Sequence, residues 1–288
     1  MIPAAFEYHR PASVQEALDL LQQWPEAKLL AGGHSLLPMM KLRVLTPPHL
    51  IDLAKLRELR GIRREGDRIV IGALSTHWEI ESSELIRRAV PLLAETAARV
   101  GDVQVRNAGT LGGSLVHADP AADPPAAILA LEAEMVVHGP KGVRTIRAAE
   151  FFKGMLTSAV APDEILVEIR VPVPPEATGT AYLKFPHPAS GFAVAGVAAW
   201  VRRQGGRLAE ARVAVTGVGP TAYRAAGVET SLRDGAVDDA AIEDAASHAA
   251  EGVEVNEDLF ANADYRSHLA RVLTRRALRA ARDRAGES

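Results

Sequence analysis

Two glycine-rich stretches hold most of the information in this 288-residue chain: Ala31-Gly32-Gly33-His34-Ser35-Leu36-Leu37-Pro38 and Gly109-Thr110-Leu111-Gly112-Gly113-Ser114. Each places paired glycines beside small hydroxyl residues, after an apolar run or before an expected helix. Glycine permits positive φ and lets a ligand approach the main chain closely, and consecutive N–H groups in such turns bind anions. Either stretch alone fits a tight structural turn. Together in one domain, they predict a cradle for a cofactor with two phosphates.

The familiar phosphate-binding and hydrolytic motifs are missing from the sequence. No Gly-Lys-Ser/Thr of a P-loop occurs, and neither stretch has the G-x-G-x-x-G spacing of a Rossmann unit. No His-Glu-x-x-His, Ser-x-x-Lys or Gly-x-Ser-x-Gly pattern occurs either. The chain therefore offers binding elements without a recognisable acid, base or nucleophile.

Composition restricts the remaining classes. The chain is 48% hydrophobic with a formal net charge of -3, which indicates about two globular domains and gives no electrostatic case for nucleic acid. No apolar run reaches the roughly 18 residues of a transmembrane segment, and the N-terminus lacks signal-peptide features, so we expect a cytoplasmic protein. There are no cysteines, so an iron–sulfur cluster on Cys thiolates would need another chain.

The first part of the chain predicts an alternation of short strands and helices. We expect a strand at 6–10, a helix after the capping box Ser13-x-x-Glu16, and a strand at 28–31 that ends in the first glycine stretch. Further expectations are strands at 50–53, 69–73 and 165–171, helices at 38–43, 79–88, 91–99 and 126–131, and a hairpin of 135–138 with 143–146.

The proline cluster Pro172-Val173-Pro174-Pro175 indicates a domain boundary. After it we expect three strands, at 180–185, 192–202 and 211–218, with a turn at Gly205-Gly206, and helices at 238–250 and 262–284. Arginines line one face of the last helix, which fits a solvated surface or a docking surface.

Several polar and aromatic side chains are candidate ligand contacts. Asp119 and Asp123 flank Pro120; Asp123 fits a cofactor hydroxyl contact or an N-cap before Pro124-Pro125, and these two roles are compatible. His34 and His117 lie in or beside the glycine stretches and fit either a ligand contact or no role. Phe192 fits an aromatic ring stacked on a cofactor or a core residue of a strand.

At these residues the chain resembles the FAD-binding medium subunits of molybdenum hydroxylases, the family of the aerobic carbon monoxide dehydrogenase medium chain and the xanthine dehydrogenase FAD subunit. The resemblance rests on Met1-Ile2-Pro3, Tyr8-His9-Arg10-Pro11, the first glycine stretch through Lys41, and the second glycine stretch. It extends over essentially the whole chain.

The resemblance implies an α+β fold. A two-part FAD-binding domain of the vanillyl-alcohol-oxidase (PCMH) type would occupy residues 1–175, with subdomains of about 1–55 and 56–175. A C-terminal domain with a three-stranded antiparallel sheet and helices would occupy 176–288. It also implies a dimer of heterotrimers, in which a large subunit carries the molybdenum cofactor and a small subunit carries [2Fe-2S] clusters. This chain would take electrons from a cluster into FAD and pass them to an external acceptor.

The resemblance also assigns cofactor contacts. The first stretch would wrap the FAD pyrophosphate, the second would close on it, Asp123 would bond a cofactor hydroxyl, Lys184 would meet the polar edge of the flavin and Phe192 would cover one face of its ring. The complete implied set is Lys28, Leu29, Leu30, Ala31, Gly32, Gly33, His34, Ser35, Leu36, Gly101, Gly109, Thr110, Gly112, Gly113, Ser114, His117, Asp123, Leu166, Lys184 and Phe192.

The chain departs from the family pattern in two places. The second stretch ends in Ser114 where Asn is frequent, and the segment 186–191 lacks the basic residues and the Asp that usually precede the aromatic residue. Two other interpretations stay open: a stand-alone FAD-dependent reductase, and a non-enzymatic module that binds nucleotides or anions.

Overall fold

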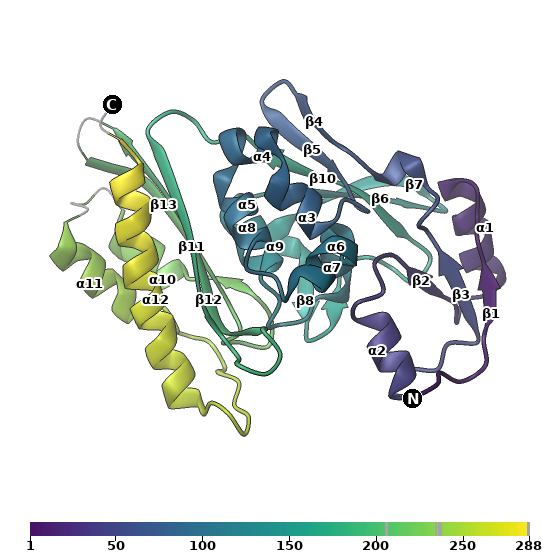
Figure 1. Ribbon diagram of the computed structural model, residues 1–288. Helices are drawn as coiled ribbons and strands as arrows, with labels where there is room; N and C mark the ends of the chain where they lie inside the picture. The colour runs from purple at the N-terminus through teal and green to yellow at the C-terminus, as the bar shows by residue number, and fades with distance from the viewer. Residues whose placement is uncertain (205–206, 234, 236–237, 287–288) are drawn as a thin grey trace.

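A small parallel sheet forms the N-terminal part of the molecule. The computed structural model describes residues 1–204, 207–233, 235 and 238–286, and Figure 1 places this sheet at one end of the molecule. Its strand order is β1-β3-β2, and both outer strands run parallel to β3. The elements are β1 (Glu7–His9), α1 (Val14–Gln23), β2 (Lys28–Leu30), α2 (Leu36–Lys41) and β3 (His49–Asp52).

Helix α1 covers this sheet because its apolar residues recur on one face. Ala17, Leu18 and Leu21 are buried and pack in one cluster with Ile51 of β3. Ser13 caps the helix by accepting a hydrogen bond from the Glu16 N–H. The predicted capping box is only half formed, since the Glu16 carboxylate accepts from the Ala12 N–H instead of returning to Ser13.

A five-stranded antiparallel sheet forms the middle of the molecule, with strand order β4-β5-β10-β6-β7. Its strands are β4 (Ile62–Glu65), β5 (Arg68–Gly72), β6 (Glu134–Gly139), β7 (Gly142–Arg147) and β10 (Ile165–Pro172). The helices around it are η1 (Arg57–Leu59), α3 (His77–Ser82), α4 (Glu84–Ala89), α5 (Pro91–Ala97), α6 (Val103–Ala108), α7 (Leu111–His117), α8 (Pro124–Ala130) and α9 (Ala148–Phe151). A short hairpin joins β8 (Phe152–Gly154) and β9 (Thr157–Ser158).

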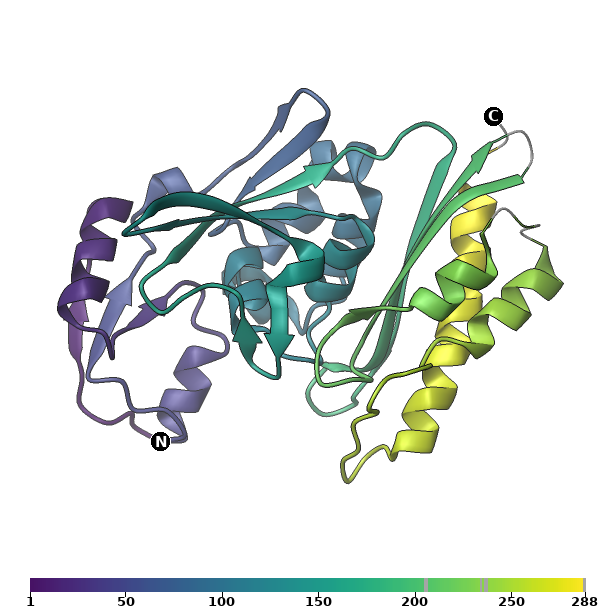
Figure 2. The same ribbon diagram turned by 180° about the vertical axis from the view of Figure 1, so that it is seen from behind.

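The C-terminal part has a sheet with helices on both faces. Its strands, in the order β11-β12-β13-β14, are β11 (Thr178–Pro186), β12 (Ala193–Gln204), β13 (Arg207–Thr216) and β14 (Tyr223–Arg224). Helices α10 (Ala226–Ser231), α11 (Asp239–Ser247) and α12 (Ala263–Arg284) lie on its outer face, as Figure 2 shows. The inner face packs against α5 and α8 of the middle region. Consequently, Trp200 and Tyr182 of this sheet belong to the same buried cluster as the central helices.

The expected elements are mostly present, and the structure adds several short ones that were not expected, among them η1, α7, α9, α10 and the β8–β9 hairpin. The helix expected over 79–88 is two helices, because Ser83 is extended and caps α4 by accepting from the Ile86 N–H. Strand β4 and helix α6 were not expected, and β14 adds a two-residue fourth strand to the three that were predicted. The turn expected at Gly205-Gly206 lies outside the described residues.

No helix in the described part of the chain combines the length and the apolar character needed to cross a bilayer.

Candidate functional site

The first glycine stretch forms a turn between β2 and α2 with free main-chain donors. Gly33 has φ +76°, a conformation that favours glycine. The N–H groups of residues 32–35 have no acceptor among the described residues, although the carbonyls of Gly33 and Ser35 accept from Leu37 and Met39. Four successive unpaired N–H groups at the end of a strand are suited to an anionic ligand.

The second stretch is not a loop over most of its length. Thr110 is the N-cap of α7, and Gly112, Gly113 and Ser114 lie in the first two turns of that helix. Its N–H groups already have protein acceptors: Leu111 bonds Ser75 O at 2.9 Å, Gly112 bonds Ala73 O at 2.9 Å, and Gly113 and Ser114 bond Thr110. This stretch therefore offers a ligand the hydroxyls of Thr110 and Ser114 and a glycine surface without side chains, rather than free main-chain N–H donors.

The two stretches lie against each other. A Cβ atom added to Gly32 would be 2.1 Å from Ala108 O and 2.7 Å from Gly109 Cα, distances that no side chain can adopt. One added to Gly113 would be 3.6 Å from the Ala31 Cβ. The close contact thus depends on glycine at position 32, and it brings the free donors of the first stretch beside the N-terminus of α7.

Asp123 lies in a buried polar cluster. Its Oδ2 is 2.7 Å from Lys184 Nζ, its Oδ1 accepts from the Tyr182 hydroxyl at 2.5 Å, and Lys184 also donates to Arg99 O at 2.9 Å. The side chains of Lys184 and Asp123 are only 3% and 4% exposed. Asp123 occupies the N-cap position of α8 but makes no side-chain capping bond, so its carboxylate joins β11 to the central helices instead.

Burial governs the electrostatics of this cluster. It raises the pKa of the Asp123 carboxyl, against the opposing effects of Lys184 and Tyr182. Burial and then the neighbouring Asp123 raise the pKa of Tyr182 well above its ordinary value. Tyr182 is consequently a neutral phenol that donates its proton to Asp123. A carboxylate accepts up to about four hydrogen bonds, so Asp123 keeps acceptor capacity for a ligand hydroxyl.

Two loops from different domains meet at Gly101. This residue has φ +44° before α6, and Gly191 has φ +72° before β12. A Cβ on Gly191 would be 3.6 Å from the Gly101 Cα. The next residue, Phe192, is 44% exposed, so the alternative of a core phenylalanine is wrong and its ring has a free surface.

The other expected contacts have different surroundings. His34 is exposed in the first turn, whereas His117 is the half-buried last residue of α7. Leu166 is 5% exposed on β10 in the main core, and α7 packs against that strand. The structure thus brings the two glycine stretches together and places Leu166 beneath the second of them.

Sequence reasoning missed His77, which directly adjoins the second stretch. Its main-chain N–H donates to Gly109 O at 3.0 Å, and a Cβ on Gly109 would be 3.2 Å from its Cδ2. Burial, Arg106 and His34 lower the pKa of His77 to about 4. Its Nδ1 is buried without a partner among the described residues. The capping box Thr76-x-x-Glu79, which forms fully, was the available sequence signal for a helix beginning at this histidine.

Tyr182 was also missed. It lies two residues before Lys184 on β11, so both side chains point to the same face of the sheet. Alternation along the strand would have paired it with Lys184 as a second donor to Asp123.

Comparison with known proteins agrees with this architecture along the whole chain. Residues 4–174 match the family described as FAD binding domain in molybdopterin dehydrogenase, and residues 180–281 match the CO dehydrogenase flavoprotein C-terminal domain. The chain is 46% identical over 282 residues to the carbon monoxide dehydrogenase medium chain of Hydrogenophaga pseudoflava, covering 98% of each chain. It is 36% identical to the caffeine dehydrogenase subunit beta of Pseudomonas sp. strain CBB1, covering 99% and 97%.

A solved structure gives the same result for the fold. The structure superposes on carbon monoxide dehydrogenase from Hydrogenophaga pseudoflava with a TM-score of 0.97 and 47% identity, covering 99% of this chain and all of that one. The chain therefore belongs to the family of FAD-binding domains of molybdopterin dehydrogenases, with a CO dehydrogenase flavoprotein domain at its C-terminus.

Proposed function

We propose that this chain binds FAD between its two glycine stretches and serves as the electron-relay subunit of a molybdenum hydroxylase. The observation that carries the proposal is the row of unpaired N–H groups at 32–35, held against the N-terminal end of α7. The proposal assigns FAD binding to a domain of residues 1–175, with subdomains of about 1–55 and 56–175, and leaves 176–288 as a separate C-terminal domain.

The donor set fits a dinucleotide with a flavin. The free N–H groups suit the diphosphate, and the hydroxyls of Thr110 and Ser114 lie on the adjoining helix turn. Asp123 would accept from a cofactor hydroxyl, while Lys184 and Phe192 would contact the flavin ring system. The full proposed set is Lys28, Leu29, Leu30, Ala31, Gly32, Gly33, His34, Ser35, Leu36, Gly101, Gly109, Thr110, Gly112, Gly113, Ser114, His117, Asp123, Leu166, Lys184 and Phe192.

The chain's own groups hold and orient the cofactor. Bound FAD supplies the redox chemistry, by accepting electrons from an iron–sulfur cluster and passing them to an external acceptor. The protein contributes fixed N–H donors, a buried Asp123–Lys184 ion pair and an exposed Phe192 ring. His77, with a pKa lowered to about 4, is neutral near pH 7 and adds no positive charge beside the second stretch.

The remaining redox centres would lie on partner chains. A chain without cysteine cannot ligate an iron–sulfur cluster through thiolates, and the relatives carry the names of subunits of carbon monoxide and caffeine dehydrogenases. We place the [2Fe-2S] clusters on a small subunit and the molybdenum cofactor on a large one, assembled as a dimer of heterotrimers. The same fold serves relatives named for carbon monoxide and for caffeine, so the large subunit would set the substrate.

Flavin content tests this proposal. The purified chain should be yellow and release FAD on denaturation, about one per chain. Gly32→Ala should abolish retention, because its Cβ would lie 2.1 Å from Ala108 O, and Gly113→Leu should do the same. Gly154→Ala is the matched control, since its Cβ would meet nothing within 4 Å.

Two results would contradict the proposal: a folded, colourless wild-type chain that cannot be reconstituted with FAD, or full flavin retention in folded Gly32→Ala protein.

A further inference from the structure

Three metal-ligating side chains gather at the edge of the N-terminal sheet, away from the glycine stretches. Glu7 and His9 lie two residues apart on β1, so they share one face of the strand. His49, the first residue of β3, lies directly opposite Glu7 in the parallel register. Strand β3 separates β1 from β2, which leads into the first glycine stretch. This cluster, which we call the β1–β3 cluster, is therefore distinct from the proposed FAD site.

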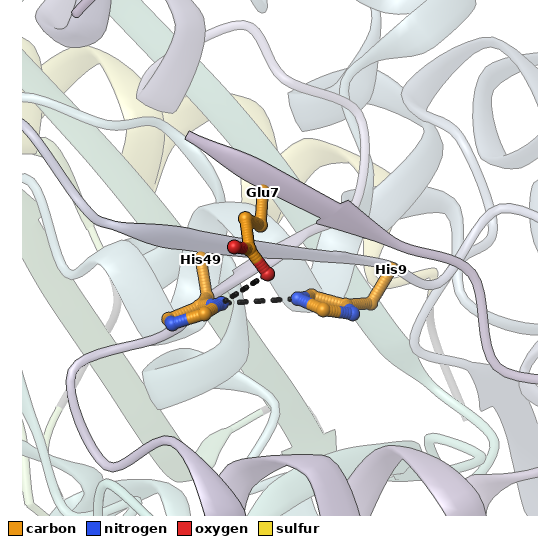
Figure 3. Close-up of side chains that lie close together, drawn as sticks. All are labelled: Glu7, His9 and His49. Atoms are coloured by element: carbon orange, nitrogen blue, oxygen red, sulfur yellow. Dashed lines mark hydrogen bonds and ion pairs between the residues drawn. The ribbon is translucent and has the colours of Figure 1, made fainter. Parts of the chain in front are cut away.

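The three side chains converge on one point, as Figure 3 shows. His9 Nε2 is 3.0 Å from His49 Nδ1, and Glu7 Oε2 is 3.8 Å from the same nitrogen. All the ligand atoms lie within 4.8 Å of one another. Two nitrogens bound tetrahedrally to one zinc ion at roughly 2.0–2.1 Å would be about 3.3 Å apart. The two nitrogens are thus already close to the separation that an ion would require. Both rings must also tilt so that their lone pairs converge off the line joining the nitrogens, and the nitrogen that donates in this 3.0 Å hydrogen bond must lose its proton.

Trp24 holds both imidazoles in place. Its indole stacks on His9 with ring centroids 4.1 Å apart at 24°, and on His49 at 4.6 Å and 14°. Metal sites require ligands whose orientation is fixed before binding, and one indole fixes two of them here. The His49 side chain is 19% exposed whereas that of Glu7 is 74% exposed, so an ion would enter from solvent on the Glu7 side.

We propose that the β1–β3 cluster binds a divalent transition-metal ion of the zinc, cobalt or nickel type through His9 Nε2, His49 Nδ1 and Glu7 Oε2. Two imidazoles and one carboxylate favour these borderline ions over Mg²⁺ and Ca²⁺, which take oxygen ligands. Three protein ligands leave a further position for water. The bound ion would link β1 to β3 and stabilise the N-terminal edge of the sheet.

Cobalt spectroscopy on the full-length, tag-free chain tests the site. Titrated Co²⁺ should produce the visible d–d bands of a four- or five-coordinate ion, saturating at about one per chain, and Zn²⁺ should displace it while excess Mg²⁺ should not. His49→Ala should weaken binding at least about 100-fold and Glu7→Ala about tenfold, the scale at which metal sites respond to lost partners. Glu7 is mostly exposed, so its variant keeps the test valid if a histidine variant fails to fold.

His248→Ala is the matched control. His248 is also paired with a carboxylate, Glu251, at 2.8 Å, but this pair lacks the second imidazole. Its removal should leave the cobalt spectrum and the zinc affinity unchanged. A spectrum at millimolar Co²⁺ that does not exceed the weak absorption of the aqueous ion, or unchanged affinity in both Glu7→Ala and folded His49→Ala protein, would overturn the proposal.

Discussion

Burial fixes the protonation state of His77. The side chain is 3% exposed, and burial, with Arg106 and His34, lowers its pKa from 6.5 to about 4. The unfolded chain takes up this proton near pH 6.5 and the folded chain only near pH 4. The unfolded state therefore binds more protons between these values, and the free energy of unfolding falls as the pH falls through this window.

This predicts a measurable acid sensitivity. The difference between 6.5 and about 4 corresponds to about 3 kcal/mol of stability. His77→Gln should be less stable than wild type at pH 7, and the difference should shrink by about 2 kcal/mol when urea unfolding is repeated at pH 4.5, where folded His77 is itself partly protonated. A constant difference between His77→Gln and wild type across this range would contradict the prediction.

The sequence indicated Asp123 as a site residue but not its bonding. The local pattern Asp123-Pro124-Pro125 favours an N-cap, whereas the donors that the carboxylate uses come from Tyr182 and Lys184, 59 and 61 residues later. Partners so distant in the sequence depend on the register of β11 against the central helices, which no local signal reports. His77 was not predicted as a neighbour of the second glycine stretch for the same reason, because its contact with Gly109 arises only in the folded chain.

Among the elements, α7 depends on the cap that Thr110 provides. The Thr110 Oγ1 accepts from the Gly113 N–H at 3.1 Å, and the Thr110 carbonyl accepts from the Ser114 N–H. The helix has only seven residues, two of them glycine, and glycine disfavours helix by about 1 kcal/mol relative to alanine. The cap therefore contributes a large share of the stability of this helix.

Two substitutions of Thr110 should distinguish the effect of its hydroxyl from the effect of its methyl group. Thr110→Val should lower the free energy of unfolding by about 1–2 kcal/mol, because the Gly113 N–H loses its acceptor, and FAD retention should weaken in parallel. Thr110→Ser should restore most of both properties. Urea unfolding and flavin content measure the two effects. A valine variant as stable as wild type would show that the cap does not matter, and a serine variant as impaired as the valine variant would show that the hydroxyl alone does not provide it.

Long periodic elements were predictable and short ones were not. The last helix was expected at 262–284, and α12 spans Ala263–Arg284 with Asn262 as its N-cap, because 22 residues of amphipathic sequence outweigh any local ambiguity. Strand β14 has two residues and pairs only with β13, so its existence depends on tertiary contact. The break at Ser83 depends on a single serine that competes as a cap.

At the scale of the whole molecule, the central and C-terminal regions interlock through the segment Asp119–Asp123. The Ala193 N–H donates to Ala121 O, the Gly217 N–H donates to Pro120 O, and the Thr216 hydroxyl lies 2.9 Å from Pro120 O and 2.7 Å from Ala122 O. Main-chain bonds thus join the ends of β12 and β13 to the loop that carries Asp123. The proline cluster thus lies between two sheets that share one buried cluster, through the inner face of the C-terminal sheet, while the outer face of that sheet and its helices form a second cluster.

The buried cluster that the central and C-terminal regions share should make them unfold in a single event. Trp200 of β12 is 2% exposed and packs in the cluster that includes the central helices, whereas Trp24 and Trp78 lie in the N-terminal and central regions. In Trp24→Phe/Trp78→Phe protein, urea unfolding followed by Trp200 fluorescence should coincide with far-UV circular dichroism. In Trp200→Phe protein, fluorescence comes from Trp24 and Trp78. Its urea midpoint should also equal the midpoint measured by far-UV circular dichroism.

Removing a contact between the central and C-terminal regions should lower the free energy of unfolding while unfolding stays a single transition. Thr216→Val removes the hydroxyl that lies within hydrogen-bond distance of two carbonyls and should lower the free energy of unfolding by about 1–2 kcal/mol.

Asp123→Asn leaves the buried Lys184 ammonium without its counter-charge and should lower the free energy of unfolding by about 3–5 kcal/mol, with earlier release of flavin on heating. Asp239→Asn, at an exposed carboxylate of α11 paired with Arg279 and Arg282 of α12, should change stability far less than Asp123→Asn does. Two separate transitions in the wild-type chain, or an Asp123→Asn protein as stable as Asp239→Asn, would show that the two regions fold independently and that the buried pair does not join them.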